Sequence, residues 1–277
     1  MGIEAQYYDN HAGNALEQVN NPKEIERAQK TVGQLPAGIK SVLDVGCGCG
    51  LTLNAIQAAR PNLKLVGLER SQKTAEEARN IFGLDVVDGS ADDLPFADDA
   101  FDVVMANEIL EHLPWGVYQK TLTELARVAR HSIIVTTPYD EKRQFVTCPQ
   151  CDCAFSPFYH VRTFNDDKLE RLFEDFTRVE QELIWVPGRT PLVYEARRLK
   201  AALGHVPPLP GKTICPQCGF RNKISTDPSG SSTPGETSVP SKSLASRIFI
   251  GLLGRLPRPK RAKWALIRYE NTALNKG

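Results

Sequence analysis

Glycines and one carboxylate form the first group of residues whose spacing suggests chemistry. Residues 45–50 read Val-Gly-Cys-Gly-Cys-Gly, after a short apolar run and before a helix-like stretch. Glycines at such a turn let a ligand lie against bare main chain. Glu69 ends the next apolar run, 19 residues after Gly50, and a carboxylate there can accept hydrogen bonds from both hydroxyls of a ribose. The pattern predicts a nucleoside-binding pocket, with a tight turn and a solvated surface glutamate as the alternative.

The spacing of these glycines excludes two other nucleotide ligands. A dinucleotide-binding loop requires Gly-x-Gly-x-x-Gly or Ala, whereas this loop reads Gly-x-Gly-x-Gly and continues with Leu51. A triphosphate-binding loop requires Gly-x-x-x-x-Gly-Lys-Ser/Thr, which the loop also lacks. We therefore expect neither a dinucleotide nor a nucleoside triphosphate in this pocket.

Cysteines form the second group. Four of the seven lie in two identical Cys-Pro-Gln-Cys knuckles at 148–151 and 215–218. The Cys-x-x-Cys spacing lets two thiolates grip one tetrahedral ion, and two such pairs supply four sulfur ligands. The predicted ligands of a structural zinc ion are Cys148, Cys151, Cys215 and Cys218. A local site that adds Cys153 and His160 to the first knuckle is one alternative, and a redox pair is another.

A histidine beside two carboxylates forms the third group. His112 follows an apolar run that is predicted to be a strand, and Glu108 and Glu111 precede it closely. The ordinary pKa of an imidazole suits it to taking a proton from an acceptor near neutral pH. The carboxylates can orient this base or bind substrate hydroxyls. A histidine that caps a helix or packs in the core is the alternative interpretation.

These residues lie at the ends of apolar runs that alternate with helix-like segments. The expected strands are 41–45, 63–68, 84–87, 101–106 and 132–137, and the expected helices are 52–59, 71–82 and 115–129, after a helical start near Pro22. This alternation predicts an α/β fold with a parallel sheet and helices on its faces. After Tyr139 the rhythm changes, with a helix expected at 166–176 and strands at 179–186 and 264–269.

Composition and charge limit the remaining interpretations. The chain has 277 residues, of which 41% are apolar, and a net charge of +1, which excludes fibrous and wholly disordered proteins. Eight basic and no acidic residues lie between Lys242 and Tyr269, which leaves 26 basic against 33 acidic residues elsewhere, a charge of −7. No secretory signal or membrane-spanning stretch is recognisable. We expect a cytoplasmic protein and leave open peripheral contact with a membrane.

The part of the chain beyond the second knuckle is expected to fall into distinct segments. Residues 188–224 form an insertion that carries this knuckle, and residues 225–243 are Ser/Thr/Pro/Gly-rich, which is typical of a flexible linker. Residues 244–261 form a basic amphipathic segment. The basic stretch 244–263 is suited to an anionic membrane, and docking on the protein's own apolar surface is the alternative.

Several motifs in order resemble class I S-adenosylmethionine-dependent methyltransferases, closest to those of quinone biosynthesis, small molecules and glycans. The motifs lie at 43–50, 65–69, 93–96, 101–104 and 108–113. The resemblance implies a Rossmann-like, doubly wound sheet of seven strands whose last strand is antiparallel. In this chain a zinc-pinned insertion would separate strands six and seven. The methyltransferase domain would comprise 1–187 and 262–277, with the first knuckle inside it.

The resemblance also implies which residues bind the cofactor, S-adenosyl-L-methionine. Glu69 would hold the ribose hydroxyls, and Asp92 with the Ala91 main chain would face the adenine. Ser90 stands where many relatives have Asp, and Asp92 or Asp88 would substitute for it. The other implied cofactor contacts are Asp44, Gly46, Gly48, Gly50, Asn107 and Tyr8, and Tyr8 with Tyr7 is also open to a packing role. His160 and Arg162 resemble residues of a bacterial subgroup and would line the acceptor pocket or make structural contacts.

Three hypotheses for the function follow. The first is an S-adenosylmethionine-dependent methyltransferase that methylates an oxygen of a small-molecule, glycan or lipid-linked acceptor, with His112 as base and Glu111 beside it. The second is an RNA methyltransferase whose knuckles and basic tail grip phosphates. Nucleic acid is the less favoured partner because no aromatic stacking platform accompanies the basic charges. The third is a cofactor-binding scaffold without catalysis.

Overall fold

The computed structural model describes residues 19–143, 145–187, 213–220 and 260–273. Close contacts divide the chain into two units. The first, here called the sheet unit, comprises 1–145, 158–184 and 262–277. The second, the cysteine unit, comprises 146–157 and 185–261. Each unit has its own cluster of buried apolar side chains.

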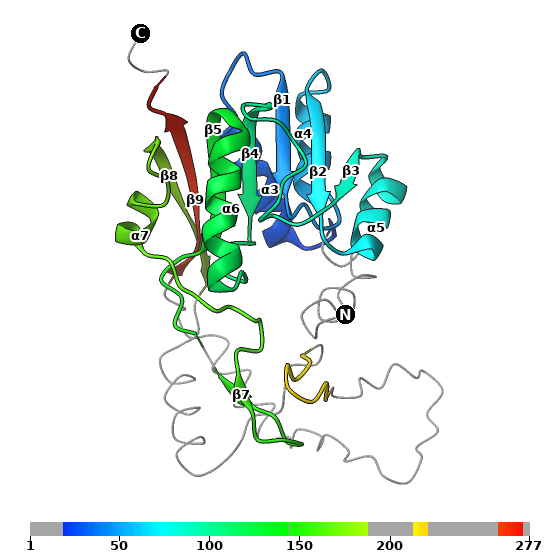
Figure 1. Ribbon diagram of the computed structural model, residues 1–277, viewed down its shortest axis with the longest axis vertical. Helices are drawn as coiled ribbons and strands as arrows, with labels where there is room; N and C mark the ends of the chain where they lie inside the picture. Colours follow the sequence, from blue (N-terminus) through cyan, green and yellow to red (C-terminus); the bar gives the residue numbers. More distant parts are fainter. Residues whose placement is uncertain (1–18, 144, 188–212, 221–259, 274–277) are drawn as a thin grey trace. The chain divides into compact units, whose positions relative to one another are not determined.

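A seven-stranded sheet in the order β3-β2-β1-β4-β5-β9-β8 forms the core of the fold (Figure 1). The strands are β1 (Ser41–Val45), β2 (Lys64–Glu69), β3 (Val86–Asp88), β4 (Phe101–Asn107), β5 (Ala129–Pro138), β8 (Phe176–Pro187) and β9 (Lys260–Asn271). The first five strands are parallel, and β9 runs antiparallel to β5. This confirms the predicted α/β sheet with its antiparallel last strand.

Helices cover both faces of the sheet. They are α3 (Pro22–Gly33), α4 (Leu51–Ala59), α5 (Gln72–Phe82), α6 (Trp115–Val128) and the short α7 (Asp166–Glu170). Figure 1 shows α6 on one face and α3 with α4 on the other. All residues of β4 are buried, as expected for a central parallel strand that helices cover on both sides. The strand order reverses between β1 and β4, and ligands of such sheets bind at the carboxyl edge beside this reversal.

Capping residues set the beginnings of two helices. The Asn21 side chain accepts a hydrogen bond from the Lys23 backbone amide, and Pro22 is the first helical residue of α3, which confirms the predicted helix start. Ser71, predicted to lie inside the next helix, is the N-cap of α5, and its hydroxyl accepts from the Thr74 amide. Ser and Asn are favoured at this position because their side chains satisfy amides that lack an intrahelical partner.

The helix predicted at 166–176 is wrong in its length. Helix α7 ends at Glu170, and Phe176 already belongs to β8, which is also longer than the predicted strand 179–186. The Tyr269 hydroxyl donates to the Leu169 carbonyl at 2.6 Å, and the Phe173 ring meets the Tyr269 ring edge-on at 5.1 Å between centroids. Packing against β9 therefore ends the helix, although the apolar spacing is helical.

Two boundaries beside the helices also differ from prediction. Strand β5 begins at Ala129, directly after α6, rather than at residue 132. Strand β3 begins at Val86 rather than at residue 84. Element ends are set by hydrogen bonds to neighbouring strands, which a single sequence does not reveal.

The described part of the cysteine unit is built around a small hairpin, β6 (Val146–Thr147) paired with β7 (Ala154–Phe155). The sequence analysis assigned the first knuckle to the methyltransferase domain. By their close contacts, residues 146–157 group with 185–261 in the cysteine unit. The predicted linker 225–243, most of the insertion 188–224, and residues 244–259 lie outside the described residues. Within the described residues, no helix has the length and apolarity to cross a bilayer.

Candidate functional site

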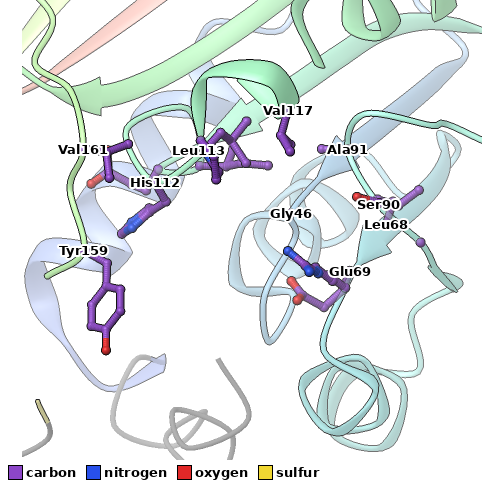
Figure 2. A pocket seen from close by; sticks show the side chains of 15 residues that line it. Gly46, Leu68, Glu69, Ser90, Ala91, His112, Leu113, Val117, Tyr159 and Val161 are labelled. Atoms are coloured by element: carbon purple, nitrogen blue, oxygen red, sulfur yellow. The ribbon is translucent and has the colours of Figure 1, made fainter. Parts of the chain in front are cut away.

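A pocket of about 170 Å³ lies in the sheet unit at the carboxyl edge of the sheet. Gly46, Glu69 and Ser90 line one side of it, and His112, Tyr159 and Val161 line the other (Figure 2). The first side follows β1, β2 and β3, and the second includes the segment after β4. The pocket therefore lies beside the reversal of strand order, where open α/β sheets bind their ligands.

The glycine loop shapes the first side of the pocket. Gly48 and Gly50 have φ angles of +56° and +84°. A Cβ atom at Gly50 would lie 2.3 Å from Leu84 Cδ1, whereas a Cβ at Gly48 would meet nothing within 4 Å. Gly50 thus serves packing at the start of α4, while the space beside Gly48 is open, and Gly46 is the glycine of this loop that lines the pocket.

Glu69 is fixed by the loop that it faces. Its Oε2 accepts from the Gly48 amide at 3.0 Å, and its Oε1 accepts from the Ser71 amide at 2.9 Å. Burial raises the pKa of Glu69, and the amides of Ser71 and Gly48 oppose this rise. Each carboxylate oxygen keeps a second lone pair, so the side chain can still accept hydrogen bonds from a ligand.

A buried polar chain extends from β1 to α3. Asp44 is 1% exposed, and its Oδ1 accepts from Asn107 Nδ2 at 3.0 Å. Asn107 Oδ1 accepts from the Thr136 hydroxyl, whose oxygen accepts from Arg27 Nη1 at 3.3 Å. Burial raises the pKa of Asp44 to about 7; the Asn107 hydrogen bond and the Arg27 charge oppose this rise, and the Glu69 charge adds to it. With this pKa, the Asp44 carboxyl gains or loses its proton near neutral pH.

Glu108 is held in a strained conformation at the pocket wall. Its φ is +55°, a left-handed value that is uncommon for residues other than glycine. Its amide donates to the Thr136 carbonyl at 2.9 Å, and Trp264 Nε1 donates to its Oε2 at 2.6 Å. Contacts with β5 and β9 therefore fix the backbone at the start of the segment that carries His112.

Glu111, His112 and His160 form a compact cluster beside the pocket. One potential ligand atom from each lies within 4.8 Å of the others, and the two imidazole rings meet edge-on at 4.8 Å. His160 Nδ1 is 2.5 Å from Glu141 Oε2. Glu111 is 1% exposed, and neither of its carboxylate oxygens has a hydrogen-bond partner. Burial and the charge of Glu108 raise the pKa of Glu111 well above its usual value.

Apolar side chains make up much of the second side, and the sequence analysis missed them. Those that line the pocket are Ile109, Leu113, Pro114, Val117 and Val161. Trp115 and Phe158, next to lining residues in the sequence, are 70% and 55% exposed. The only available signal was Leu-Pro-Trp at 113–115, directly after the candidate base.

Of the predicted site residues, Gly46, Glu69, Ala91 and His112 line the pocket. The predicted contacts that do not line it are Asp44, Gly48, Gly50, Asp92, Asn107 and Glu111. Ser90 lines it, and its hydroxyl donates to Asp92 Oδ1 at 2.5 Å. Tyr7 and Tyr8 lie outside the described residues.

Arg162, one of two candidates for the acceptor pocket, makes structural contacts. Its guanidinium lies 3.7 Å from the centre of the Tyr118 ring, and its Nη1 donates to the Leu110 carbonyl at 2.6 Å. These partners occupy one of its N–H donors and one face of its planar group, and Arg162 is not among the residues that line the pocket.

The four predicted zinc ligands come together in the cysteine unit. Cys148 Sγ lies 3.6 Å from Cys218 Sγ, and Cys151 Sγ lies 3.6 Å from Cys215 Sγ. A tetrahedral site with Zn–S bonds of about 2.3 Å would separate its sulfurs by roughly 3.8 Å, whereas a disulfide requires about 2.05 Å. The spacing between sulfurs fits a four-thiolate site and not a pair of disulfides.

The two knuckles share one backbone pattern. In the first, the Cys148 amide donates to the Cys153 carbonyl and the Asp152 amide to the Cys148 carbonyl; in the second, the Cys215 amide donates to Phe220 and the Gly219 amide to Cys215. Asp152 and Gly219, at the same place in each knuckle, have φ values of +55° and +72°. His160, a ligand of the alternative site, belongs to the sheet unit, where it faces Glu141.

The profile of the family described as methyltransferase domain matches residues 42–132. Residues 42–132 are therefore similar to a methyltransferase domain. The matched range contains the glycine loop, Glu69 and His112, so the family match and the pocket coincide.

Two curated relatives match this methyltransferase domain. Phthiotriol/phenolphthiotriol dimycocerosates methyltransferase from Mycobacterium tuberculosis is 33% identical over 113 residues, which cover 40% of this chain and 41% of that protein. Fatty-acid O-methyltransferase from Mycolicibacterium smegmatis is 35% identical over 113 residues, with 40% of each chain covered. The chain thus matches about two fifths of the length of each relative.

Solved structures share the fold of the methyltransferase domain. A chain in the complex between the Haloferax volcanii Trm112 methyltransferase activator and a methyltransferase superposes with a TM-score of 0.54 at 16% identity, covering 95% of this chain and 96% of that chain. A methyltransferase from Bacillus halodurans C-125 gives a TM-score of 0.51 at 15% identity, with 89% and 98% covered. At these identities the likeness shows the fold alone.

Proposed function

We propose that this protein transfers a methyl group from S-adenosyl-L-methionine to a hydroxyl oxygen of an apolar, lipid-type small molecule. The observation that carries this proposal is the two-sided pocket. Open main chain and a fixed carboxylate form one side, and an imidazole among apolar side chains forms the other. Such a pocket suits a polar nucleoside on one side and an apolar acceptor on the other.

The first side fits the cofactor. Gly46 lines the pocket, a Cβ at Gly48 would meet nothing within 4 Å, and Glu69 is held by two amides with lone pairs left for ribose hydroxyls. The other proposed contacts are Asp44, Gly46, Gly50, Ala91, Asp92 and Asn107. S-adenosyl-L-methionine, when bound, supplies a methyl group on a positively charged sulfur. The buried carboxyl of Asp44 is suited to balance part of that positive charge.

The second side supports an apolar acceptor. Ile109, Leu113 and Val161 line the pocket, and the ring of Trp115 is largely exposed beside them in sequence. Exposed aromatic side chains next to an apolar pocket are typical of sites that bind apolar ligands. Two relatives of the matched region are named for methylating fatty acids and dimycocerosate lipids.

The residues of the second side have two tasks in the reaction. His112 accepts the proton of the acceptor hydroxyl, and Glu111 lies beside it as a buried carboxyl. The apolar lining excludes water, so the acceptor oxygen is the only nucleophile in line with the methyl group. The products are a methyl ether or ester, S-adenosylhomocysteine and one proton.

We also propose that the four cysteines bind one structural zinc ion. The sulfur spacing and the matching turns of the two knuckles support this assignment. All four positions would be occupied by thiolates, as in structural rather than catalytic zinc sites. The basic stretch 244–263 is proposed to bring the protein to anionic membranes, where lipid acceptors reside.

The function is tested by methyl transfer from isotopically labelled S-adenosyl-L-methionine into fractionated cell extract. We expect label in the lipid fraction with the wild-type chain and with Glu76→Ala, which changes an exposed glutamate of α5. Glu69→Ala should abolish it. Label in RNA would favour the second hypothesis and contradict the lipid acceptor, and the absence of label in every fraction would favour a scaffold.

A further inference from the structure

Two imidazoles and one carboxylate converge at one edge of the pocket. Glu111 and His112 come from the segment after β4, and His160 comes from the segment that precedes α7, 48 residues after His112. One donor atom from each lies within 4.8 Å of the other two. His112 itself lines the pocket, as do Tyr159 and Val161 on either side of His160 (Figure 2). The fold thus brings His160 to the neighbouring residues Glu111 and His112, from which it is distant in sequence.

Glu111 is the unusual member of the cluster. Its carboxylate is almost fully buried, and neither oxygen has a hydrogen-bond partner. Buried polar groups in native proteins are nearly always paired, and a buried carboxylate is destabilising unless a cation or a donor accompanies it. The charges of Glu108 and Glu141 add repulsion, which its own backbone amide and the charge of Arg27 oppose. A cation between Glu111 and the two imidazoles would satisfy this group.

His160 is already oriented as a ligand. Its Nδ1 lies 2.5 Å from Glu141 Oε2, which leaves Nε2 as the ring nitrogen that can bind another group. A carboxylate behind a histidine fixes the tautomer and raises the basicity of the other nitrogen, and this arrangement accompanies most metal-binding histidines. Glu141 therefore acts as a positioning residue for His160.

We propose that Glu111, His112 and His160 bind one divalent transition-metal cation at the edge of the pocket. Two histidines and one carboxylate are a ligand set of open metal sites, in which the remaining coordination positions face a substrate. Imidazole donors favour zinc, copper, iron or nickel over calcium or magnesium, which prefer oxygen, and the carboxylate also suits manganese. The site is distinct from the four-cysteine cluster, which offers only sulfur.

The role of this site rests on the proposed function. A cation here lowers the pKa of an acceptor hydroxyl that approaches it, so the hydroxyl loses its proton to solvent. The acceptor oxygen then forms a bond to the methyl carbon while the carbon–sulfur bond breaks. His112 would serve as a ligand in this form of the enzyme, and as the proton acceptor only when the cation is removed.

Manganese is the probe of choice, because thiolate sites bind it poorly. The full chain is freed of loosely held metal with a chelator and titrated with Mn²⁺ by calorimetry and by electron paramagnetic resonance. We expect one Mn²⁺ per chain, binding weakened at least 100-fold in Glu111→Gln and His160→Gln, and 10- to 100-fold in Glu141→Gln. His131→Gln, which changes a half-exposed histidine of the sheet unit, should bind as the wild type does.

Thermal unfolding shows whether each variant is folded. Without metal, Glu111→Gln should unfold at or above the wild-type temperature because a buried charge is removed. Mn²⁺ should raise the unfolding temperature of the wild type and of His131→Gln but not that of Glu111→Gln. No saturable binding of Mn²⁺ or Zn²⁺ at this cluster would overturn the inference. If S-adenosylhomocysteine still binds and acceptor is still methylated, the proposed function survives that result. A cation that binds to a chain with no affinity for S-adenosylhomocysteine would contradict the proposed function and leave the metal site standing.

Discussion

The two units position their reactive side chains by different physical means. In the sheet unit a large cluster of buried side chains from the strands and α6 fixes the loops at the strand ends. In the described part of the cysteine unit the buried cluster consists of Cys148, Phe155 and Cys215, two of which are candidate ligands. A core of that size stabilises little by itself. The pocket is therefore formed by the packing of apolar side chains. The stability of the cysteine unit is expected to depend on the metal ion proposed to bind its thiolates.

Zinc removal should produce the largest difference in behaviour between the two units. Binding of a structural zinc typically contributes about 10–16 kcal/mol to folding, so a chelator should make the cysteine unit sensitive to protease while the sheet unit still binds S-adenosylhomocysteine. Limited proteolysis with metal analysis by mass spectrometry measures this. Cys148→Ser should behave like the chelated protein, and Cys153→Ser like the wild type. Equal protection with and without zinc would show that the cysteine unit is packed as firmly as the sheet unit.

The buried carboxyl of Asp44 should make the free energy of unfolding of the sheet unit depend on pH. The pKa of Asp44 is raised to about 7 in the folded chain, so between roughly pH 4 and pH 7 the folded state keeps a proton that the unfolded state has released. Stability should therefore fall as pH rises through this window, by about 3–4 kcal/mol in total, and level off above it. Urea unfolding of wild type and Asp44→Asn measures the effect, which the variant should lack. An identical slope in both chains would contradict the assignment to Asp44.

The glycine loop offers a matched pair of substitutions. Gly50→Ala places a Cβ 2.3 Å from Leu84 Cδ1 at a φ of +84°, and Gly48→Ala meets only open space at +56°. Both pay about 1–2 kcal/mol for the left-handed backbone, and Gly50→Ala loses roughly 1–3 kcal/mol more through overpacking. Urea unfolding should show this difference. Gly48→Ala, although the more stable variant, should lose more cofactor affinity in calorimetry. The reverse order of stability would mean that packing does not fix the loop.

The smallest expected difference is between the substitutions of two exposed tryptophans. Trp115 follows Pro114 of the pocket, and Trp185 belongs to the cysteine unit; they are 70% and 53% exposed. Exposed substitutions usually change stability by less than about 0.5 kcal/mol, so neither Trp115→Ala nor Trp185→Ala should shift unfolding. Trp115→Ala should raise the KM for an apolar acceptor roughly tenfold, the effect of about 1.4 kcal/mol of lost contact. A similar rise in Trp185→Ala would remove the argument that the acceptor lies in the pocket.

Local patterns explain which features the sequence could predict. The glycine loop and Glu69 are recognisable because each lies at the end of an apolar strand, and the order of these strands carries the fold. The cysteine cluster is recognisable because one short motif occurs twice. Both features depend on residues that are close in sequence or identical in pattern.

Features that depend on contacts between residues far apart in sequence were not predicted. The meeting of His112 with His160 requires two loops to converge across 48 residues. The early end of α7 requires the Tyr269 hydroxyl, 100 residues beyond Leu169. Close contacts group residues 146–157 with 185–261. From the sequence order, the first knuckle was expected to belong to the methyltransferase domain. In each case the deciding contact joins strands or loops that no periodicity connects.

Calorimetric titration of the full chain with S-adenosyl-L-methionine tests the central claim most directly. The account predicts one site per chain, an affinity reduced about 100-fold in Glu69→Ala because two hydrogen bonds to a carboxylate are lost, and no change in Glu76→Ala. Absence of binding in the wild type, or equal affinity in all three chains, would contradict it.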